Sequence, residues 1–287
     1  MPPPGFLPPR YSQQGLLLYD SCSFLGLFCN GWRLISHFLS VQLPADMTSE
    51  PAVEMGLCAR FADVHARIRL AAERCKRQAT DITVVAITKT HPAERIREAL
   101  ACGATDFGEN RVQEAEGKIL EVGRNQARWH LVGHLQTNKA KRAVRLFDVI
   151  HSVDSVELAQ RLDRLCDEEG RDLLPVLVQV KLGSEDTKSG IDEEHLLEVV
   201  RAVASCRNIK LIGLMSVPPY FDNPEDVRPF FRRLRELRDD IREQGFFSGG
   251  DGELSMGMTH DFEVAIEEGA TIVRVGTAIF GERPTAG

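Results

Sequence analysis

Residues 84–92 read VVAITKTHP, and they place a lysine, Lys89, between an apolar run rich in β-branched residues and a turn marked by Pro92. A short apolar run bounded by a turn signal is typical of a strand that is buried on both faces of a parallel sheet. Lys89 is therefore predicted to stand at the carboxyl end of a strand, where α/β proteins gather their functional groups.

Strands of this kind alternate with amphipathic segments along most of the chain. The predicted strands cover residues 82–88, 105–110, 128–135, 147–153, 174–182, 209–217, 253–258 and 271–281. The predicted helices cover residues 55–78, 92–102, a segment that ends near 122, 138–146, 155–169, 192–205, 224–243 and 260–268. Eight such units predict a single (β/α)₈ TIM barrel. A doubly wound open sheet is the alternative, but it usually has fewer strands, and no G-x-G-x-x-G follows the first strand.

Composition indicates a globular protein and argues against a nucleic-acid partner. The 287 residues are 43% hydrophobic and 27% charged, and the formal net charge is −7. Nucleic acids are bound by clustered Lys and Arg, whereas the basic stretches at 138–145 and 232–243 are interpreted as solvated helix faces.

The first 46 residues differ from the rest of the chain. No apolar run in them reaches the ~18–20 residues of a membrane-spanning helix, and no clean signal peptide is recognisable. A transit peptide, a weak membrane-surface element and translation from an upstream start codon remain as interpretations, and we favour the last. We therefore predict an extension over 1–46, disordered or included by a mis-assigned start, and a barrel over 47–287 that begins at Met47.

Seven cysteines are scattered along the chain without a C-x-x-C pair or a zinc-like spacing. This pattern predicts neither a disulfide framework nor a metal site. A reducing cytoplasm is the expected location.

Two predicted loops suggest a phosphate site beside Lys89. The seventh strand ends in SMGM (255–258) and the eighth in RVGTA (274–278), and TIM barrels commonly bind phosphate with the loops after these strands. A lone lysine usually extends into solvent at the barrel rim. Next to a phosphate site, however, a partly desolvated amine suits pyridoxal 5′-phosphate (PLP), whose aldehyde forms a Schiff base with lysine. The stretch GSEDTKSG (183–190) is a candidate second anion site.

The sequence resembles the YggS/PROSC group of PLP homeostasis proteins. The resemblance covers nearly all of residues 47–287, and it is carried by the motifs VVAITKTHP, FGENRVQEAEGKI, WHLVGHLQTNK, SVDS, TKSGI, GLMSV and LSMGMTHDFEVAIEEGATIVRVGTAIFG. It implies an alanine-racemase-like barrel with PLP as cofactor. Because the chain continues for only a few residues after the eighth strand, we expect no C-terminal β domain of the kind that racemases add.

Roles for individual residues follow from this resemblance. Lys89 matches the lysine that forms the Schiff base, and Arg274 matches the arginine that faces the pyridine nitrogen. Asn110 matches the asparagine at the ring side. The phosphate-binding loops match Ser255, Gly276, Thr277 and the backbone near Met256. We also assign Met215, in GLMSV, to the cofactor site.

Other polar residues near strand ends receive structural interpretations. His134 and His151 are interpreted as hydrogen-bonded structural histidines, and His260 receives no role. Tyr220, the only tyrosine after residue 46, is interpreted as a packing or rim residue.

The predicted function is a PLP carrier that holds the cofactor on Lys89 and supplies it to apo-enzymes. An arginine opposite the pyridine nitrogen disfavours ring protonation and so weakens the ring as an electron sink. We therefore expect no turnover, no metal, no nucleic-acid or membrane partner, and a monomer. The alternative from another class is an enzyme, either a minimal amino-acid racemase or a Schiff-base aldolase.

Overall fold

The computed structural model describes residues 55–183, 189–247 and 250–282. The prediction for residues 1–46, its boundary at Met47 and the centre of the GSEDTKSG stretch lie outside the described residues. All described residues belong to one compact unit, Val53–Gly287.

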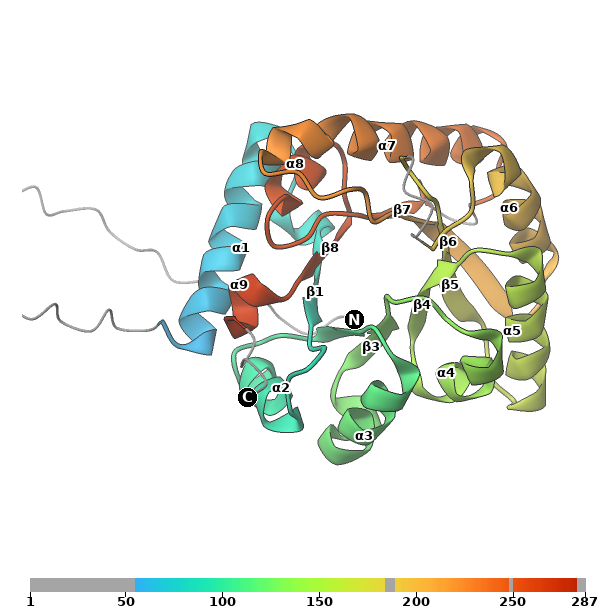
Figure 1. The fold of residues 1–287 in the computed structure, drawn as a ribbon, viewed down its shortest axis with the longest axis horizontal. Helices are drawn as coiled ribbons and strands as arrows, with labels where there is room; N and C mark the ends of the chain where they lie inside the picture. Colours follow the sequence, from blue (N-terminus) through green and yellow to red (C-terminus); the bar gives the residue numbers. More distant parts are fainter. Residues whose placement is uncertain (1–54, 184–188, 248–249, 283–287) are drawn as a thin grey trace, which may run out of the picture. The chain divides into compact units, whose positions relative to one another are not determined.

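Eight parallel strands close into a barrel, which confirms the predicted TIM fold (Figure 1). The strands are β1 (Thr83–Ile87), β2 (Asp106–Glu109), β3 (Arg128–Leu131), β4 (Val149–Val153), β5 (Leu174–Gln179), β6 (Ile209–Met215), β7 (Glu253–Ser255) and β8 (Ile272–Val275). They follow one another around the barrel in chain order, and β8 pairs with β1. This pairing brings the last strand of the chain beside the first.

Helices form a ring outside the strands (Figure 1). The α-helices are α1 (Leu57–Arg74), α2 (Ala93–Ala101), α3 (Val112–Val122), α4 (Ala140–Leu146), α5 (Val156–Glu168), α6 (Leu196–Ser205), α7 (Arg228–Glu243), α8 (Phe262–Glu267) and α9 (Thr277–Phe280). Short 3₁₀ turns are η1 (Ala79–Asp81), η2 (Arg124–Gln126), η3 (Thr137–Lys139), η4 (Glu193–His195) and η5 (Pro224–Val227). In α5, buried Leu158, Leu162 and Leu165 share one face at helical spacing, and the Ser155 hydroxyl caps the first turn by accepting the Leu158 N–H at 3.2 Å.

Successive side chains of each strand point to opposite faces of the sheet, and the two faces contribute to two apolar regions. In β3, Trp129 and Leu131 join the large core between the strands and the helices. In β1, Val85 and Ile87 instead join a smaller cluster inside the barrel, with side chains from β4, β5, β6 and β8. Gly108 faces this interior, because a Cβ added there would lie 2.5 Å from Ile87 Cδ1. The inner cluster forms an apolar floor beneath the carboxyl ends of the strands.

The last predicted strand is shorter than expected and is followed by a helix. The prediction covers 271–281, but β8 ends at Val275, and α9 begins at Thr277. The carbonyl of Gly276 accepts N–H groups from Ile279 and Phe280 at 2.9 and 3.0 Å. These local bonds convert the segment after Val275 into a short helix at the mouth of the barrel.

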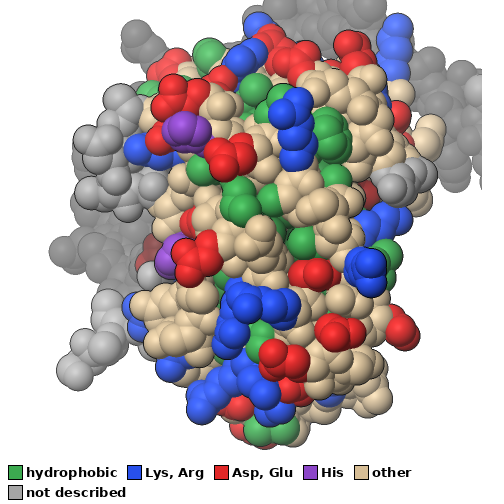
Figure 2. Space-filling view, turned by 90° about the vertical axis from the view of Figure 1, so that its right-hand side faces the viewer, with side chains coloured by type: hydrophobic (Ala, Val, Ile, Leu, Met, Phe, Trp, Pro, Cys, Tyr) green, Lys and Arg blue, Asp and Glu red, His purple; other side chains and the backbone are tan. Residues whose placement is uncertain are grey.

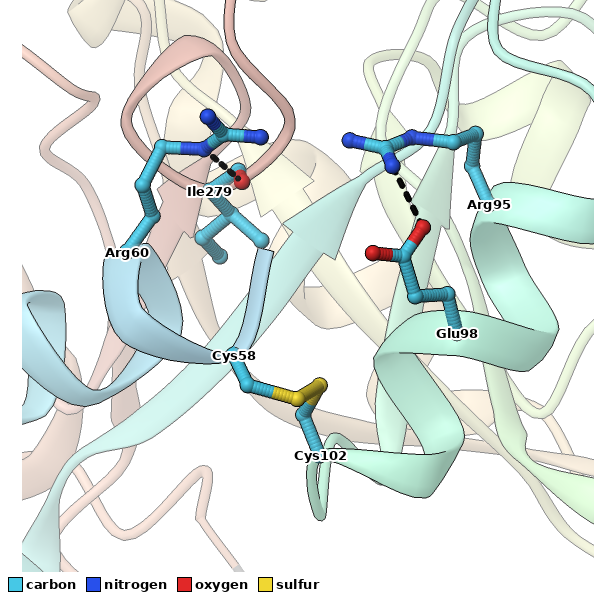
Figure 3. Close-up of a disulfide and its surroundings, with 6 residues drawn as sticks. All are labelled: Cys58, Arg60, Arg95, Glu98, Cys102 and Ile279. Atoms are coloured by element: carbon cyan, nitrogen blue, oxygen red, sulfur yellow. Dashed lines mark hydrogen bonds and ion pairs between the residues drawn. A yellow bond between two sulfur atoms is a disulfide. The ribbon is translucent and has the colours of Figure 1, made fainter. Parts of the chain in front are cut away.

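A disulfide joins Cys58 at the start of α1 to Cys102 at the end of α2 (Figure 3), so the prediction that the cysteines form no disulfide is wrong. The two residues are 44 positions apart in sequence, but the packing of α1 beside α2 brings their Cα atoms within 5.1 Å. Sequence spacing alone does not reveal such a contact, which the fold creates.

The same two helices hold α9. Arg60 of α1 donates to the Ile279 carbonyl at 2.9 Å, and Arg95 of α2 donates to the Phe280 carbonyl at 3.2 Å. Figure 3 shows Arg60 and Arg95 on the two helices that the disulfide joins. The disulfide therefore links the two helices that support the helix at the barrel mouth.

Acidic and basic side chains are interspersed on the face shown in Figure 2, which is the side of α5 and α6. That face carries no continuous basic stripe of the kind that tracks a phosphate backbone. Among the described residues, no helix has both the length and the apolar character needed to cross a bilayer.

We predict that reducing the disulfide lowers the stability of the barrel. Closing a loop of 44 residues restricts the unfolded chain, which corresponds to up to about 4 kcal/mol in the loop-entropy treatment. Urea unfolding should therefore show a lower midpoint in the presence of a thiol reductant. In the Cys58→Ser variant the midpoint should be low and unaffected by the reductant. An equal midpoint for the wild type with and without reductant would contradict the prediction.

Candidate functional site

A cavity of about 530 Å³ opens at the carboxyl ends of the strands. It is lined by Ile87, Lys89, Asn110, Val132, Val217, Tyr220, Met258, Thr259, His260, Asp261, Arg274, Gly276 and Thr277. Five of the eight residues predicted for the cofactor site meet here, namely Lys89, Asn110, Arg274, Gly276 and Thr277. The barrel thus gathers residues from both ends of the domain around one hollow.

The loop that carries Lys89 is fixed by a buried ion pair. Lys118 of α3 donates to the Thr88 carbonyl at 2.6 Å and to Glu109 Oε1 at 2.7 Å. The Thr88 hydroxyl donates to the same Glu109 oxygen at 2.6 Å. On the other side of Lys89, the Thr90 N–H donates to Glu114, which also pairs with Lys118 at 2.7 Å. Both neighbours of Lys89 are therefore held by one charged cluster.

Burial and charge act in opposite directions on the two acids of this cluster. Complete burial raises the pKa of Glu109, although Lys118 and Thr88 oppose that shift. Burial would also raise the pKa of Glu114, but hydrogen bonds from Lys118 and the Thr90 N–H outweigh it and hold this pKa below its usual value. The cluster hydrogen-bonds the backbone on both sides of Lys89, where Thr90 has a positive φ of 67°.

Arg274 projects from β8 into the floor of the cavity and is almost fully buried. It donates to Ser255 Oγ at 2.7 Å and to the Ser216 carbonyl at 2.8 Å. Burial lowers the pKa of Arg274 to about 10, while nearby Asp261 opposes the shift. The guanidinium therefore stays protonated at pH 7 and offers only donors to a ligand.

Two threonines and a glycine form the part of the cavity wall next to α9. Gly276 and Thr277 begin this helix, and Thr259 in the loop after β7 lies against it, where its hydroxyl accepts the Ala278 N–H at 3.4 Å. The loop itself needs Gly257, which has a φ of 88° and at which an added Cβ would lie 2.5 Å from the Ala265 Cβ. Thr259 follows SMGM directly, but its sequence context did not reveal this position in the cavity wall.

Three predicted residues lie below the cavity and do not line it. Met215 belongs to the apolar cluster inside the barrel, and Met256 belongs to the core between strands and helices. Ser255 is fully buried, and its hydroxyl contacts Arg274 and His151, the latter at 2.9 Å. His151 is buried and hydrogen-bonded, as predicted.

Two exposed rings stand at the edge of the cavity. Tyr220 and His260 lie with their ring centroids 5.3 Å apart, and the His260 ring nitrogen Nε2 lies 3.1 Å from the Asp222 carbonyl. Tyr220 is 71% exposed, so it is a rim residue as predicted. His134 lies outside this cavity and contacts Asp154 at 3.3 Å.

Comparison with known proteins gives a consistent assignment. Residues 61–284 match the family described as the alanine racemase N-terminal domain. The chain is 44% identical over 229 residues to the pyridoxal phosphate homeostasis protein of Aquifex aeolicus. The aligned part covers 80% of this chain and 99% of that protein. It is 39% identical over 228 residues to the pyridoxal phosphate homeostasis protein of Escherichia coli K12, covering 78% and 95% of the two chains.

A solved structure with the same barrel comes from Synechococcus elongatus. The structure of PipY with PLP bound superimposes with a TM-score of 0.69 at 36% identity, and covers 79% of this chain and all of PipY. With the barrel, the cavity and these relatives taken together, the chain belongs to the alanine racemase N-terminal domain family and, within that family, to the pyridoxal phosphate homeostasis proteins.

Proposed function

We propose that this chain binds PLP in the cavity at the barrel mouth, holds it covalently through Lys89 and supplies it to apo-enzymes. The observation that carries the proposal is the meeting of Lys89, Arg274, Gly276 and Thr277 around one hollow. The relatives are named PLP homeostasis proteins, and PipY was solved with PLP bound. When bound, PLP supplies an aldehyde that reacts reversibly with amines.

The residues around the cavity fit this cofactor. A lysine amine, an arginine and two threonine hydroxyls offer partners for an aldehyde, a ring nitrogen and a phosphate, while Ile87, Val132 and Val217 provide apolar surface. Beside Arg274, the buried hydroxyl of Ser216 has no hydrogen-bond partner among the described residues. A buried polar group that the protein leaves unpaired needs an explanation, and a bound ligand next to Arg274 would be one.

Each residue can be given a task within this proposal. Lys89 would form the covalent bond, and Asn110 would lie at the ring side. Arg274 would donate to the ring nitrogen. Thr277 and Gly276 would bind the phosphate together with Thr259, which lies against the same helix. Ser255, Met215 and Met256 would support the site from below, because none of them lines the cavity.

We further propose that the chain catalyses no turnover of amino acids. A protonated Arg274 cannot accept a proton from the ring nitrogen, so it does not favour the protonated ring that stabilises carbanions. Tyr220 lines the cavity and favours the alternative, a minimal racemase with this residue as second base. Its exposure of 71% leaves it in contact with water, whereas a base at the reacting carbon is usually held in a shielded site.

The setting that we propose is the cytoplasm, with the protein as a monomer that has no nucleic-acid or membrane partner. Cys75, Cys166 and Cys206 are free thiols, as is usual in a reducing compartment. The disulfide of Cys58 and Cys102 argues in the other direction, but Cys58 is exposed and so is accessible to cellular thiols. Alkylation of thiols at the moment of cell lysis tests this setting, since a reducing compartment should open the disulfide and leave Cys58 and Cys102 both alkylated.

We predict that Lys89→Ala abolishes covalent PLP binding. Borohydride should then trap no cofactor on the peptide that contains position 89, and the visible absorption of the bound cofactor should disappear, because Lys89 is the one lysine among the described residues that line the cavity. Lys141→Ala is the matched control, since Lys141 is half-exposed and pairs with Glu169 outside the cavity. Undiminished trapping in Lys89→Ala would assign PLP to another lysine. Amino-acid turnover by the wild type that Lys89→Ala abolishes would favour the enzyme instead.

We predict that Thr277→Ala and Thr259→Ala each weaken PLP binding by roughly 1–2 kcal/mol, as for the loss of a hydrogen bond to a charged group. Titration with PLP and with pyridoxal separates the phosphate contribution, because pyridoxal lacks the phosphate and should bind equally to all three proteins. Equal losses for the two ligands would place the phosphate elsewhere in the cavity.

We predict that deletion of residues 1–46 leaves PLP binding and thermal stability nearly unchanged. The family match begins at residue 61, and the described residues that line the cavity all lie at position 87 or beyond. Thermal unfolding and PLP titration of the shortened chain check this. A large loss of either property would show that the extension contributes to the domain.

A further inference from the structure

A continuous chain of hydrogen bonds crosses the inside of the barrel from Arg274 to an aspartate. Arg274 donates to Ser255 Oγ at 2.7 Å, and Ser255 Oγ lies 2.9 Å from His151 Nδ1. His151 Nε2 lies 2.9 Å from His130 Nδ1, and His130 Nε2 lies 2.9 Å from Asp106 Oδ1. Arg274 lines the cavity at the carboxyl end of the barrel, whereas Asp106 is the first residue of β2 and so lies at the opposite end.

The donors and acceptors in this chain of hydrogen bonds allow one consistent direction of donation. The Asp106 carboxylate can only accept, so His130 donates through Nε2–H. A neutral His130 then accepts at Nδ1, which requires His151 to donate through Nε2–H. A neutral His151 accepts at Nδ1, so the Ser255 hydroxyl donates to it and accepts from Arg274. Every proton in the chain therefore points from the arginine towards the aspartate.

The surroundings favour neutral histidines between charged ends. Burial lowers the pKa of His130 and holds the pKa of His151 well below its usual value. Asp106 is only partly buried, and the hydrogen bonds from His130 and Thr105 outweigh burial and lower its pKa. A chain of neutral groups between a cation and an anion is polarised along its length, which strengthens each hydrogen bond.

Arg274 needs such a partner because it is a buried charge. Within the described part of the chain, no carboxylate lies within ion-pair distance of its guanidinium; the acid that acts on it electrostatically is Asp261. An isolated buried cation is strongly destabilising unless it is compensated. Lys118, a buried cation near the Lys89 loop, is compensated by direct contact with Glu109.

We propose that Asp106 is the counter-ion of Arg274, acting through His130, His151 and Ser255, and that this chain positions Arg274 and adjusts the protonation of PLP from the far end of the barrel. The inference rests on the proposed function, since it concerns PLP held at Arg274. Asp106, His130, His151 and Ser255 are positioning residues, because none of them lines the cavity.

Other charged groups face this chain of hydrogen bonds, and a test must separate their effects from the effect of Asp106. Arg128 lies 4.0 Å from Asp106 and also acts on both histidines. Asp148 acts on His130, and His65 lines the small hollow beside Asp106. Asp261 acts on Arg274. All of them remain in the variants used below.

The first test measures the pH at which the visible absorption of the Lys89-bound cofactor is half lost. Asp106→Asn removes the charge but keeps an acceptor, and His151→Leu interrupts the chain but keeps the charge. Both should move the midpoint to lower pH by about half a unit or more, because a bound positive charge loses its proton more readily when negative compensation is removed. Glu253→Gln is the matched control, since it removes a carboxylate at the start of β7, the same end of the barrel, and should leave the midpoint unchanged.

Each outcome is decisive. An unchanged midpoint in Asp106→Asn overturns the counter-ion role. A shift in Asp106→Asn without one in His151→Leu overturns the role of the chain, because the charge would then act through space. Thermal unfolding shows whether each variant is folded. If the wild type carries no trapped cofactor on Lys89, the proposed function fails and this test is replaced by the next one.

The second test needs no PLP, and its main measurement uses the wild-type protein. Histidine ¹⁵N spectra of the wild-type protein without cofactor report which ring nitrogen carries the proton. His130 and His151 should both be neutral with the proton on Nε2 from pH 6 to pH 8, and Asp106→Ala should disturb this state at His130. A proton on Nδ1 of either ring, or a charged ring at pH 7, overturns the polarity of the chain.

Discussion

The pairing of β1 with β8 is the constraint on which the site depends. Val85 lies opposite Arg274 in this pair, and Ala86 lies opposite Val275. Because the two strands run parallel and in register, the loops that follow them emerge side by side at the mouth. Lys89 and Thr277 therefore line one cavity although 188 positions separate them in the sequence. If the barrel did not close, the amine and the proposed phosphate site would lie on opposite edges of an open sheet.

Two buried cations lie behind this mouth, and they are stabilised differently. Lys118 contacts two carboxylates directly and fixes the backbone on both sides of Lys89. Arg274 contacts a hydroxyl and a carbonyl, and the counter-ion that we propose for it, Asp106, lies across the barrel. A direct carboxylate at Arg274 would occupy its donors. Because neutral groups separate it from Asp106, Arg274 can line the cavity without a carboxylate against it, which suits the proposed donation to a ring nitrogen.

The outer helices support the cavity wall next to α9. The short helix α9 carries Thr277 at its start, and its last carbonyls accept from Arg60 and Arg95. Those arginines belong to α1 and α2, which the disulfide joins. A helix of four residues is too short to be stable by its own hydrogen bonds, so its position depends on these outer contacts. The cavity is thus bounded by one wall fixed from inside the barrel and one fixed from outside.

The sequence by itself determined the eight-strand barrel and the main members of the site. Apolar runs with turn signals reveal buried strands, and the amphipathic period of 3.6 reveals helices, because both patterns are local. The end of each strand then identifies the mouth, and the family resemblance adds the individual residues. Lys89, Asn110, Arg274, Gly276 and Thr277 all line the cavity.

Only the tertiary structure decided which polar residues face the cavity and which face one another. Ser255 and Thr259 lie in the same motif, yet Ser255 is turned to the buried His151 while Thr259 lines the cavity. The disulfide, the helix after Val275 and the chain from Arg274 to Asp106 join residues from different elements. Their partners are set by how the strands are placed around the barrel. No local pattern records this placement, because a hydrogen bond between distant residues depends on distances that only packing defines.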